Sequence, residues 1–190
     1  MTSLQHSVTS SLHLTCEELE DGLGHVLSAP KGVGALELIV RRPAIDEREV
    51  VDEAVLDLEH GLVGDSWESR GRSRGRPANR AAQITLTSAR AIALVARSRE
   101  RWALAGDQLY VDLDLSQGNV PPGTRLAIGP AVLEVSNEPH TGCKKFAARF
   151  GLEALKFFST EEGLALNLRG INARVVEPGT VRTGDAVRKL

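Results

Sequence analysis

Alternating hydrophobic and polar positions dominate the chain from residue 34 onward and predict a mainly β protein. About eight short strands are predicted, over 35–41, 48–56, 83–86, 109–115, 124–128, 131–136, 171–176 and 186–187. Helical spacing is confined to the short segments 15–26, 87–96, 143–150, 152–158 and 161–166. Because the helices are short and Gly/Pro turns link strands as hairpins, the pattern favours a β-barrel with peripheral helices over a doubly wound sheet.

Local signals mark the ends of several elements and the domain organisation. Thr15 and Glu18 form a capping-box pattern that opens the first helix, and Pro30 ends it. Gly129–Pro130 joins 124–128 to 131–136 as a hairpin. We expect residues 1–30 to form a loosely held tail and a short helix, and residues 31–190 to form one barrel domain.

The segment 109–115 shows the clearest alternation in the chain. One face carries Leu109, Val111, Leu113 and Leu115, and the other carries Tyr110, Asp112 and Asp114. This predicts a half-buried strand with both carboxylates on the wet face. A solvated edge is therefore favoured over acid–base catalysis by Asp112 and Asp114.

Composition and charge narrow the function classes. The chain has 190 residues, is 42% hydrophobic and 25% charged, and carries a net charge of −2, which gives no general attraction to nucleic acid or anionic lipid. Its two cysteines lie far apart, and it contains neither a secretory-signal pattern nor an apolar run long enough to span a bilayer. We expect a reduced, cytoplasmic protein without nucleic-acid or membrane partners.

The segment 69–80 stands out because it holds five arginines among small residues and has no apolar anchor. It is expected to be a mobile, solvated loop. Arg72, Arg74 and Arg76 either close over an anionic ligand or belong to an excursion without a ligand. RNA binding is less favoured, because the total charge is acidic and no aromatic residues interleave the arginines.

Cys143 is the strongest candidate for chemistry. It follows the Pro139–Gly142 turn and precedes an amphipathic segment that Gly151 ends, so it should lie in the first turn of a helix. The helix N-terminus and the adjacent Lys144 and Lys145 should favour its thiolate, as a nucleophile or sulfur carrier requires. The alternative is a small, buried, structural cysteine.

A second motif is the compact turn Gly61–Leu62–Val63–Gly64–Asp65, in which two glycines can take conformations that other residues resist. Asp65 is expected to hold neighbouring N–H groups or a basic partner. A turn-forming role for Asp65 is at least as well supported as a ligand role.

Taken in order, several motifs resemble the MOSC family, the molybdenum cofactor sulfurase C-terminal domain, including its stand-alone bacterial members. The matching pieces are GLVGD at 61–65, QITL at 83–86, PGTRLAIG at 122–129, PHTGC at 139–143, and Arg169–Gly170 through Gly179 to Gly184–Asp185. Together they span roughly residues 35–188. The chain departs from the family at Ala82, where arginine is usual, and at Gly142, where proline is frequent.

The resemblance implies a MOSC-type β-barrel that handles sulfur or the molybdenum–pterin cofactor through a cysteine in a cleft. Cys143 would then be the catalytic residue, as a persulfide carrier or a molybdenum ligand. The residues expected to bind the cofactor are Asp65, Lys144, Lys145, Arg149, Arg169 and Asn172. The expected partners are the small-molecule cofactor and a cysteine desulfurase or redox protein.

Two other readings remain open at this point. The first is a non-catalytic binding module that recognises a pterin, another anionic ligand or a protein, with a structural cysteine. The second is a zinc site made by His140 and Cys143, which is disfavoured because a structural zinc site usually needs four ligands.

Overall fold

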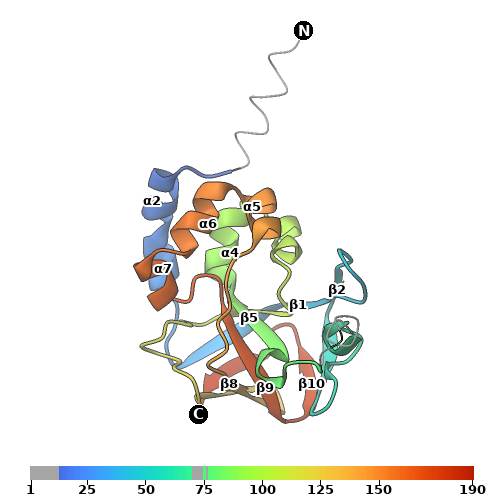
Figure 1. Cartoon of the computed structure of the whole chain (residues 1–190). Helices are drawn as coiled ribbons and strands as arrows, with labels where there is room; N and C mark the ends of the chain where they lie inside the picture. The colour runs from blue at the N-terminus through green and yellow to red at the C-terminus, as the bar shows by residue number, and fades with distance from the viewer. Residues whose placement is uncertain (1–12, 70–74, 76) are drawn as a thin grey trace.

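The computed structural model describes residues 13–69, 75 and 77–190. Within that part of the chain, the strands form a barrel and the helices stack over one end of it (Figure 1). Most of the expected N-terminal tail lies outside the described residues. The same is true of Arg72, Arg74 and Arg76 in the arginine-rich segment.

Seven strands make a closed barrel. In spatial order they are β1 (Val33–Arg41), β6 (Leu109–Asp112), β5 (Ile84–Ser88), β9 (Ile171–Glu177), β8 (Ala131–Val135), β7 (Arg125–Ile128) and β11 (Ala186–Lys189). The ring closes because β11 pairs with β7 along one edge and with β1 along the other. All pairs are antiparallel except β5–β6, which is parallel and is connected through the helical layer.

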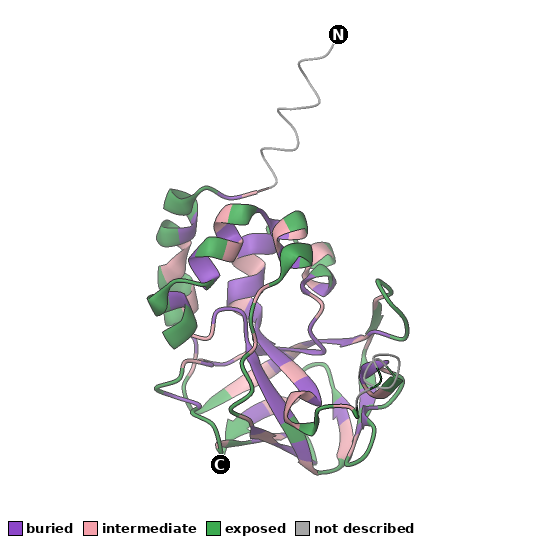
Figure 2. Cartoon of the chain, viewed as in Figure 1, coloured by how far each residue is buried: buried purple, intermediate pink, exposed green. Residues whose placement is uncertain are grey.

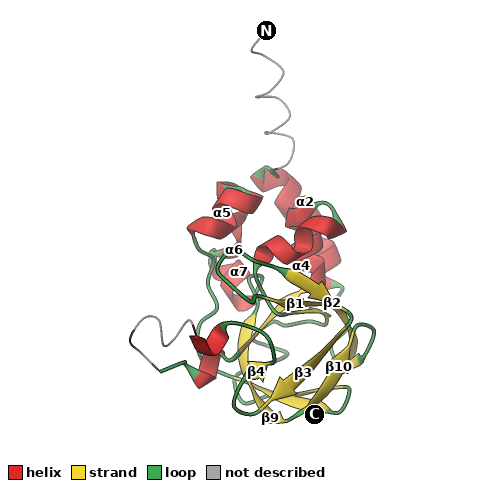
Figure 3. Cartoon of the chain, turned by 90° about the vertical axis from the view of Figure 1, so that its right-hand side faces the viewer, coloured by secondary structure: helices red, strands yellow, loops and turns green. Residues whose placement is uncertain are grey.

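A smaller sheet packs on one side of the barrel and faces the viewer in Figure 3. It contains β10 (Gly179–Arg182), β3 (Glu53–Asp57) and β4 (Gly61–Leu62), in that order. One further strand, β2 (Glu49–Val51), pairs antiparallel with the last three residues of β1.

The helices are short, as the apolar spacing predicts. They are α2 (Cys16–Leu27), α4 (Ala89–Ala96), α5 (Lys144–Phe150), α6 (Leu152–Phe158) and α7 (Glu161–Ala165), with 3₁₀ turns η1 (Arg80–Ala82) and η2 (Arg99–Ala105). The capping box of Thr15 and Glu18 is present, and Ser88 and Thr160 cap α4 and α7. No helix among the described residues has both the length and the apolar character needed to cross a bilayer.

Two hydrophobic cores share β1 and β6. Leu36 and Val111 face the barrel interior, whereas Leu38 and Tyr110, on the opposite side of the same strands, pack under the helices. Figure 2 shows this as buried surface on both the strands and the inner sides of the helices. The helical layer therefore seals the outer face of these two strands.

The predicted elements need correction in several places. The segment 48–56 is two strands that break at Asp52, and β10 and η2 were not predicted. The strand expected over 109–115 ends at Asp112, and Tyr110 is fully buried rather than on a wet face. Tyr110 is buried because the helices cover that face, where its hydroxyl donates to the carbonyl of Trp102 over 2.9 Å. Asp112 stays half-exposed and binds Arg90.

Candidate functional site

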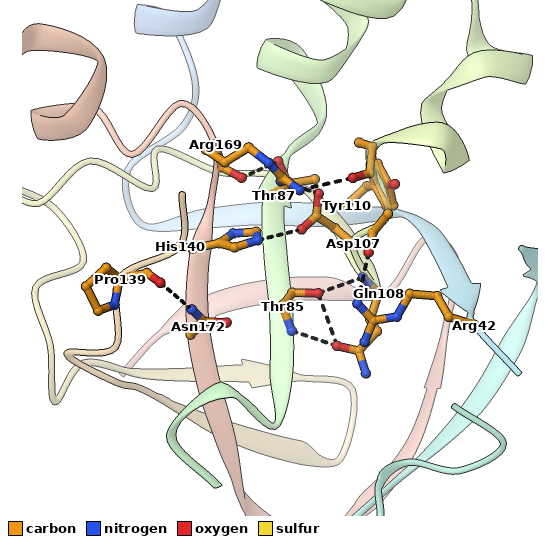
Figure 4. Close-up of polar contacts among 12 residues, drawn as sticks. Arg42, Thr85, Thr87, Asp107, Gln108, Tyr110, Pro139, His140, Arg169 and Asn172 are labelled. Atoms are coloured by element: carbon orange, nitrogen blue, oxygen red, sulfur yellow. Dashed lines mark hydrogen bonds and ion pairs between the residues drawn. The ribbon is translucent and has the colours of Figure 1, made fainter. Parts of the chain in front are cut away.

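Segment 136–143 leaves β8 and leads directly into α5, and Asn172 holds it in place. Asn172 Nδ2 donates to the carbonyls of Glu138 and Pro139, each over 3.2 Å. Asn172 itself is 4% exposed and belongs to β9, a barrel strand (Figure 4). A rigid strand thus fixes the loop that ends at Cys143.

The same loop places His140 against a buried ion pair. Arg169 Nη1 lies 2.6 Å from Asp107 Oδ2, and Arg169 Nη2 donates to the carbonyl of Ala105 over 3.0 Å. His140 Nε2 approaches Asp107 Oδ1 to 3.2 Å, without the alignment of a good hydrogen bond. We call Asp107, His140 and Arg169 the Asp107 cluster (Figure 4).

Burial decides the charge state of His140. Desolvation lowers the pKa of His140 to about 4, with Arg169 and Arg42 lowering it further and Asp107 opposing the shift. His140 Nδ1, on the other side of the ring, is buried and has no hydrogen-bond partner among the described residues. At neutral pH the cluster holds one anion and one cation, so its charge is balanced.

A pocket of about 440 Å³ borders the loop. Its walls include Glu138, His140, Thr141 and Asn172, together with apolar side chains such as Val120, Pro121, Val135 and Ile171. This volume lies within the usual range for small-molecule sites, about 300–1,000 Å³. No lysine or arginine is among the described residues that line it.

Cys143 caps the N-terminus of α5, one residue before the first helical turn, and its free thiol is exposed. It does not line the pocket, although Thr141, two residues earlier, does. A helix does begin at this point, as predicted, although Cys143 is its N-cap residue and not part of the first turn. The prediction of a buried cysteine is wrong, because the thiol is exposed. The thiol stands beside the pocket rather than inside it.

Cationic side chains gather around the end of η2, next to the Asp107 cluster, where Arg42 and Arg149 donate to the carbonyls of Gly106 and Leu104. Lys145 Nζ lies 2.6 Å from Asp46 Oδ1, and Arg149 Nη2 lies 3.3 Å from the same oxygen. Arg42 and Arg48 complete this group, because Arg42 and Arg149 both lower the pKa of Arg48. We call Arg42, Arg48, Lys145 and Arg149 the basic cluster.

Asp65 anchors Arg42 within the basic cluster. Its carboxylate accepts from the backbone N–H of Arg42 (3.0 Å), from Arg42 Nε (2.7 Å) and from the N–H of Trp67 (2.8 Å). Asp65 was predicted to hold neighbouring N–H groups or a basic partner, and it does both. Gly64, at φ +88°, packs against the Arg41 side chain, which explains the glycine in the turn.

The predicted site residues fall into three groups. Asn172 clamps the loop, Arg169 is buried on Asp107, and Asp65 binds Arg42. Lys145 and Arg149 join the basic cluster, whereas Lys144 is exposed at the start of α5. Whether any of them binds a cofactor stays a prediction.

Sequence reasoning missed Asp107 and Arg48. Asp107 follows Gly106 in a turn that carries no recognisable motif, and its partners lie 33 and 62 residues further along the chain. Arg48 was read only as the start of a strand. A buried acid and an unpaired arginine become visible only when the fold brings distant segments together.

The family model for the MOSC domain matches residues 78–188. The chain belongs to the MOSC domain family. This MOSC domain thus includes β5 through β11, and with them Asp107, Cys143 and Asn172.

Solved structures agree with this assignment at the level of fold. The YuaD protein from Bacillus subtilis is 22% identical, with a TM-score of 0.55, and the match covers 82% of this chain and 94% of that one. YiiM from Escherichia coli is 20% identical, with a TM-score of 0.52, and the match covers 82% and 69% respectively. No curated protein matches the sequence significantly.

Proposed function

We propose that this MOSC domain handles sulfur or a molybdenum–pterin cofactor through Cys143. The observation that carries the proposal is an exposed, unpaired thiol at the end of a loop that Asn172 and the Asp107 cluster hold rigidly beside a pocket. A reactive group on a fixed support, next to a concave surface, is the arrangement that binding and chemistry need.

The residues present fit such a cofactor. Among the described residues, no group of three His, Cys, Asp or Glu side chains is placed to hold a metal ion. A molybdenum–pterin cofactor brings sulfur ligands of its own, so one soft thiolate suffices from the protein. Its phosphate needs cationic partners, which the basic cluster offers and the pocket walls lack.

When bound, the cofactor would supply a redox-active metal with sulfur ligands. Cys143 would hold the metal, and Lys145 and Arg149 would neutralise negative charge near the same helix. Asn172 and His140 would keep the loop in position without touching the metal. Arg169 is a weak candidate for phosphate binding, because it is buried and its guanidinium is held by the fully buried Asp107 and by the carbonyl of Ala105.

As a sulfur carrier, Cys143 would use the same exposure. Its thiolate would attack the outer sulfur of a persulfide on a donor protein such as a cysteine desulfurase. A new S–S bond would form on Cys143, the donor's S–S bond would break, and the donor's thiolate would leave. Exposure of the thiol, rather than enclosure in the pocket, suits a transfer between two proteins.

The experiment compares wild-type protein with Cys143→Ser and Cys16→Ser, purified from a host that makes the cofactor. Molybdenum is measured by elemental analysis and persulfide by mass spectrometry. We expect Cys143→Ser to lose both signals and Cys16→Ser, which removes the other exposed thiol, to keep them. Equal contents in all three proteins would favour a binding module in which the cysteine takes no part.

A further inference from the structure

The basic cluster carries more positive charge than its own carboxylates balance. Asp65 pairs with Arg42, and Asp46 is shared between Lys145 and Arg149. Four cationic side chains therefore share two anionic ones. Arg48 has no carboxylate within ion-pair distance in the described part of the chain.

The backbone at Gly106 brings two of these guanidinium groups together. A Cβ atom built on Gly106 would lie 3.2 Å from Arg48 Nη2 and 3.9 Å from Arg149 Nη1. Arg42 Nη1 donates to the carbonyl of the same glycine over 2.9 Å. Three arginines thus converge on one residue without a side chain: Arg42 directly follows β1, Arg48 directly precedes β2, and Arg149 belongs to α5.

Of the three arginines at Gly106, Arg48 uses the fewest of its N–H donors. Its Nη1 donates to the carbonyl of Glu47, and its buried Nε has no partner. Partial burial, Arg149 and Arg42 all lower the pKa of Arg48, which reflects the cost of holding like charges together. An anion bound beside Arg48 would reduce the repulsion between Arg48, Arg42 and Arg149.

We propose that Arg48 and Arg149, over Gly106, form a binding site for a phosphate monoester dianion. Arg149 donates from Nη1 to the carbonyl of Leu104 and from Nη2 to Asp46, and Arg48 donates from Nη1 to the carbonyl of Glu47. The N–H groups that remain on the two guanidinium groups can bind phosphate oxygens, and the excess charge of two matches the dianion. The phosphate belongs either to a pterin cofactor, in which case the inference rests on the proposed function, or to a phosphorylated substrate.

Helix α5 links Cys143 to the proposed phosphate site. Arg149 is six residues further along the helix that Cys143 caps, a rise of about 9 Å. Because positions six residues apart point about 120° apart around the helix, a ligand that reaches both the thiol and the arginines must also curve around α5. Lys145, between them, would add a third cation when Asp46 releases it.

Binding of inorganic phosphate to the full chain, measured by calorimetry at low ionic strength, tests the site. We expect Arg48→Gln and Arg149→Gln each to weaken binding about tenfold or more, since each removes a charge-assisted hydrogen bond. Arg174→Gln is the matched control, because Arg174 is an exposed arginine of β9 that pairs with Glu134 and makes no contact with the basic cluster. Asp46→Asn should strengthen binding severalfold by removing the competing anion.

The opposite signs expected for Arg48→Gln and Asp46→Asn keep the test decisive even if one variant folds poorly. Absence of phosphate binding by the wild type, or equal losses in Arg48→Gln and Arg174→Gln, would overturn the proposal. Unchanged affinity in Asp46→Asn, with a circular dichroism spectrum like that of the wild type, would also count against it.

Cofactor-loaded protein identifies the source of the phosphate. If Arg48→Gln loses both phosphate affinity and bound pterin, measured by fluorescence after release, the site holds the cofactor. If it loses phosphate affinity and keeps its pterin, the site serves a phosphorylated substrate. A wild type that binds phosphate but never carries pterin, molybdenum or persulfide would refute the proposed function and leave the phosphate site standing.

Discussion

The Asp107 cluster and the basic cluster use similar side chains in opposite ways. In the first, Asp107 and Arg169 balance each other's charge, and both lie within the protein. In the second, the cations outnumber the carboxylates, and Asp46 and Lys145 are more than half exposed. A balanced, buried pair fixes the geometry of a loop, whereas an unbalanced, exposed group keeps binding capacity for a ligand.

The largest difference between the two clusters should appear in stability. Asp107→Asn leaves the Arg169 charge buried without a counter-ion, so we expect it to cost about 3–5 kcal/mol of unfolding free energy. Asp46→Asn removes ion pairs of an exposed carboxylate, which solvent screens, so it should change the unfolding free energy far less. Urea unfolding of both variants measures this contrast, and similar losses would show that the clusters do not differ.

The second difference concerns pH. His140 has a pKa of about 4 in the folded protein and an ordinary value of 6.5 when unfolded, so acid favours the unfolded state. Its contribution is constant above about pH 6.5, falls as the pH drops toward 4, and is constant again below 4. The shift corresponds to a loss of about 3 kcal/mol over that window.

His140→Gln isolates this effect because glutamine does not titrate. The difference in unfolding free energy between wild type and variant, measured from pH 7.5 to pH 3.5, should shrink as the pH falls from 6.5 to 4. A difference that stays constant over this range would mean that His140 is not buried in its neutral form.

A smaller effect is expected when Arg48 is replaced. Arg48→Gln removes a cation that repels its neighbours and has no carboxylate partner, so the unfolding free energy should change by no more than about 0.5 kcal/mol. Thermal unfolding at low salt provides the measurement. A large destabilisation would place Arg48 among the structural residues, together with Arg169.

The smallest effect on stability is expected at Cys143. Cys143→Ser should change the unfolding free energy by about 0.5 kcal/mol or less, because the thiol is exposed and packs against little. Iodoacetamide should label Cys143 faster than Cys16, whose pKa is raised by its hydrogen bond to Glu20. Peptide mass spectrometry over time distinguishes the two thiols, and faster labelling of Cys16 would contradict the expectation.

Local patterns predicted the elements better than the surroundings of those elements. Period-2 alternation located most barrel strands, and the capping box of Thr15 and Glu18 marked the start of α2 correctly. The wet face assigned to Tyr110 was wrong, because alternation reports which residues share a face and not what covers it. Which elements cover the face of a strand depends on the whole fold.

The candidate site was only partly visible for the same reason. Cys143 and Asp65 could be found because turn glycines and neighbouring charges mark them locally. Asp107 and Arg48 carry no such mark, and they matter only through partners that approach in space. Charge balance could not be read from the sequence either, since the total of −2 hides a local excess of positive charge.

The closure of the barrel by β11 has a consequence for biosynthesis. Val33 of β1 pairs with Arg188 of β11, so the ring forms only after almost all of the chain described here has been translated. Contacts between residues so far apart in the sequence slow folding. Until β11 has paired with β1 and β7, the edges of those two strands stay open to other strands. A nascent chain stalled before residue 186 should therefore be sensitive to protease and prone to aggregate, and should lose both traits once β11 emerges.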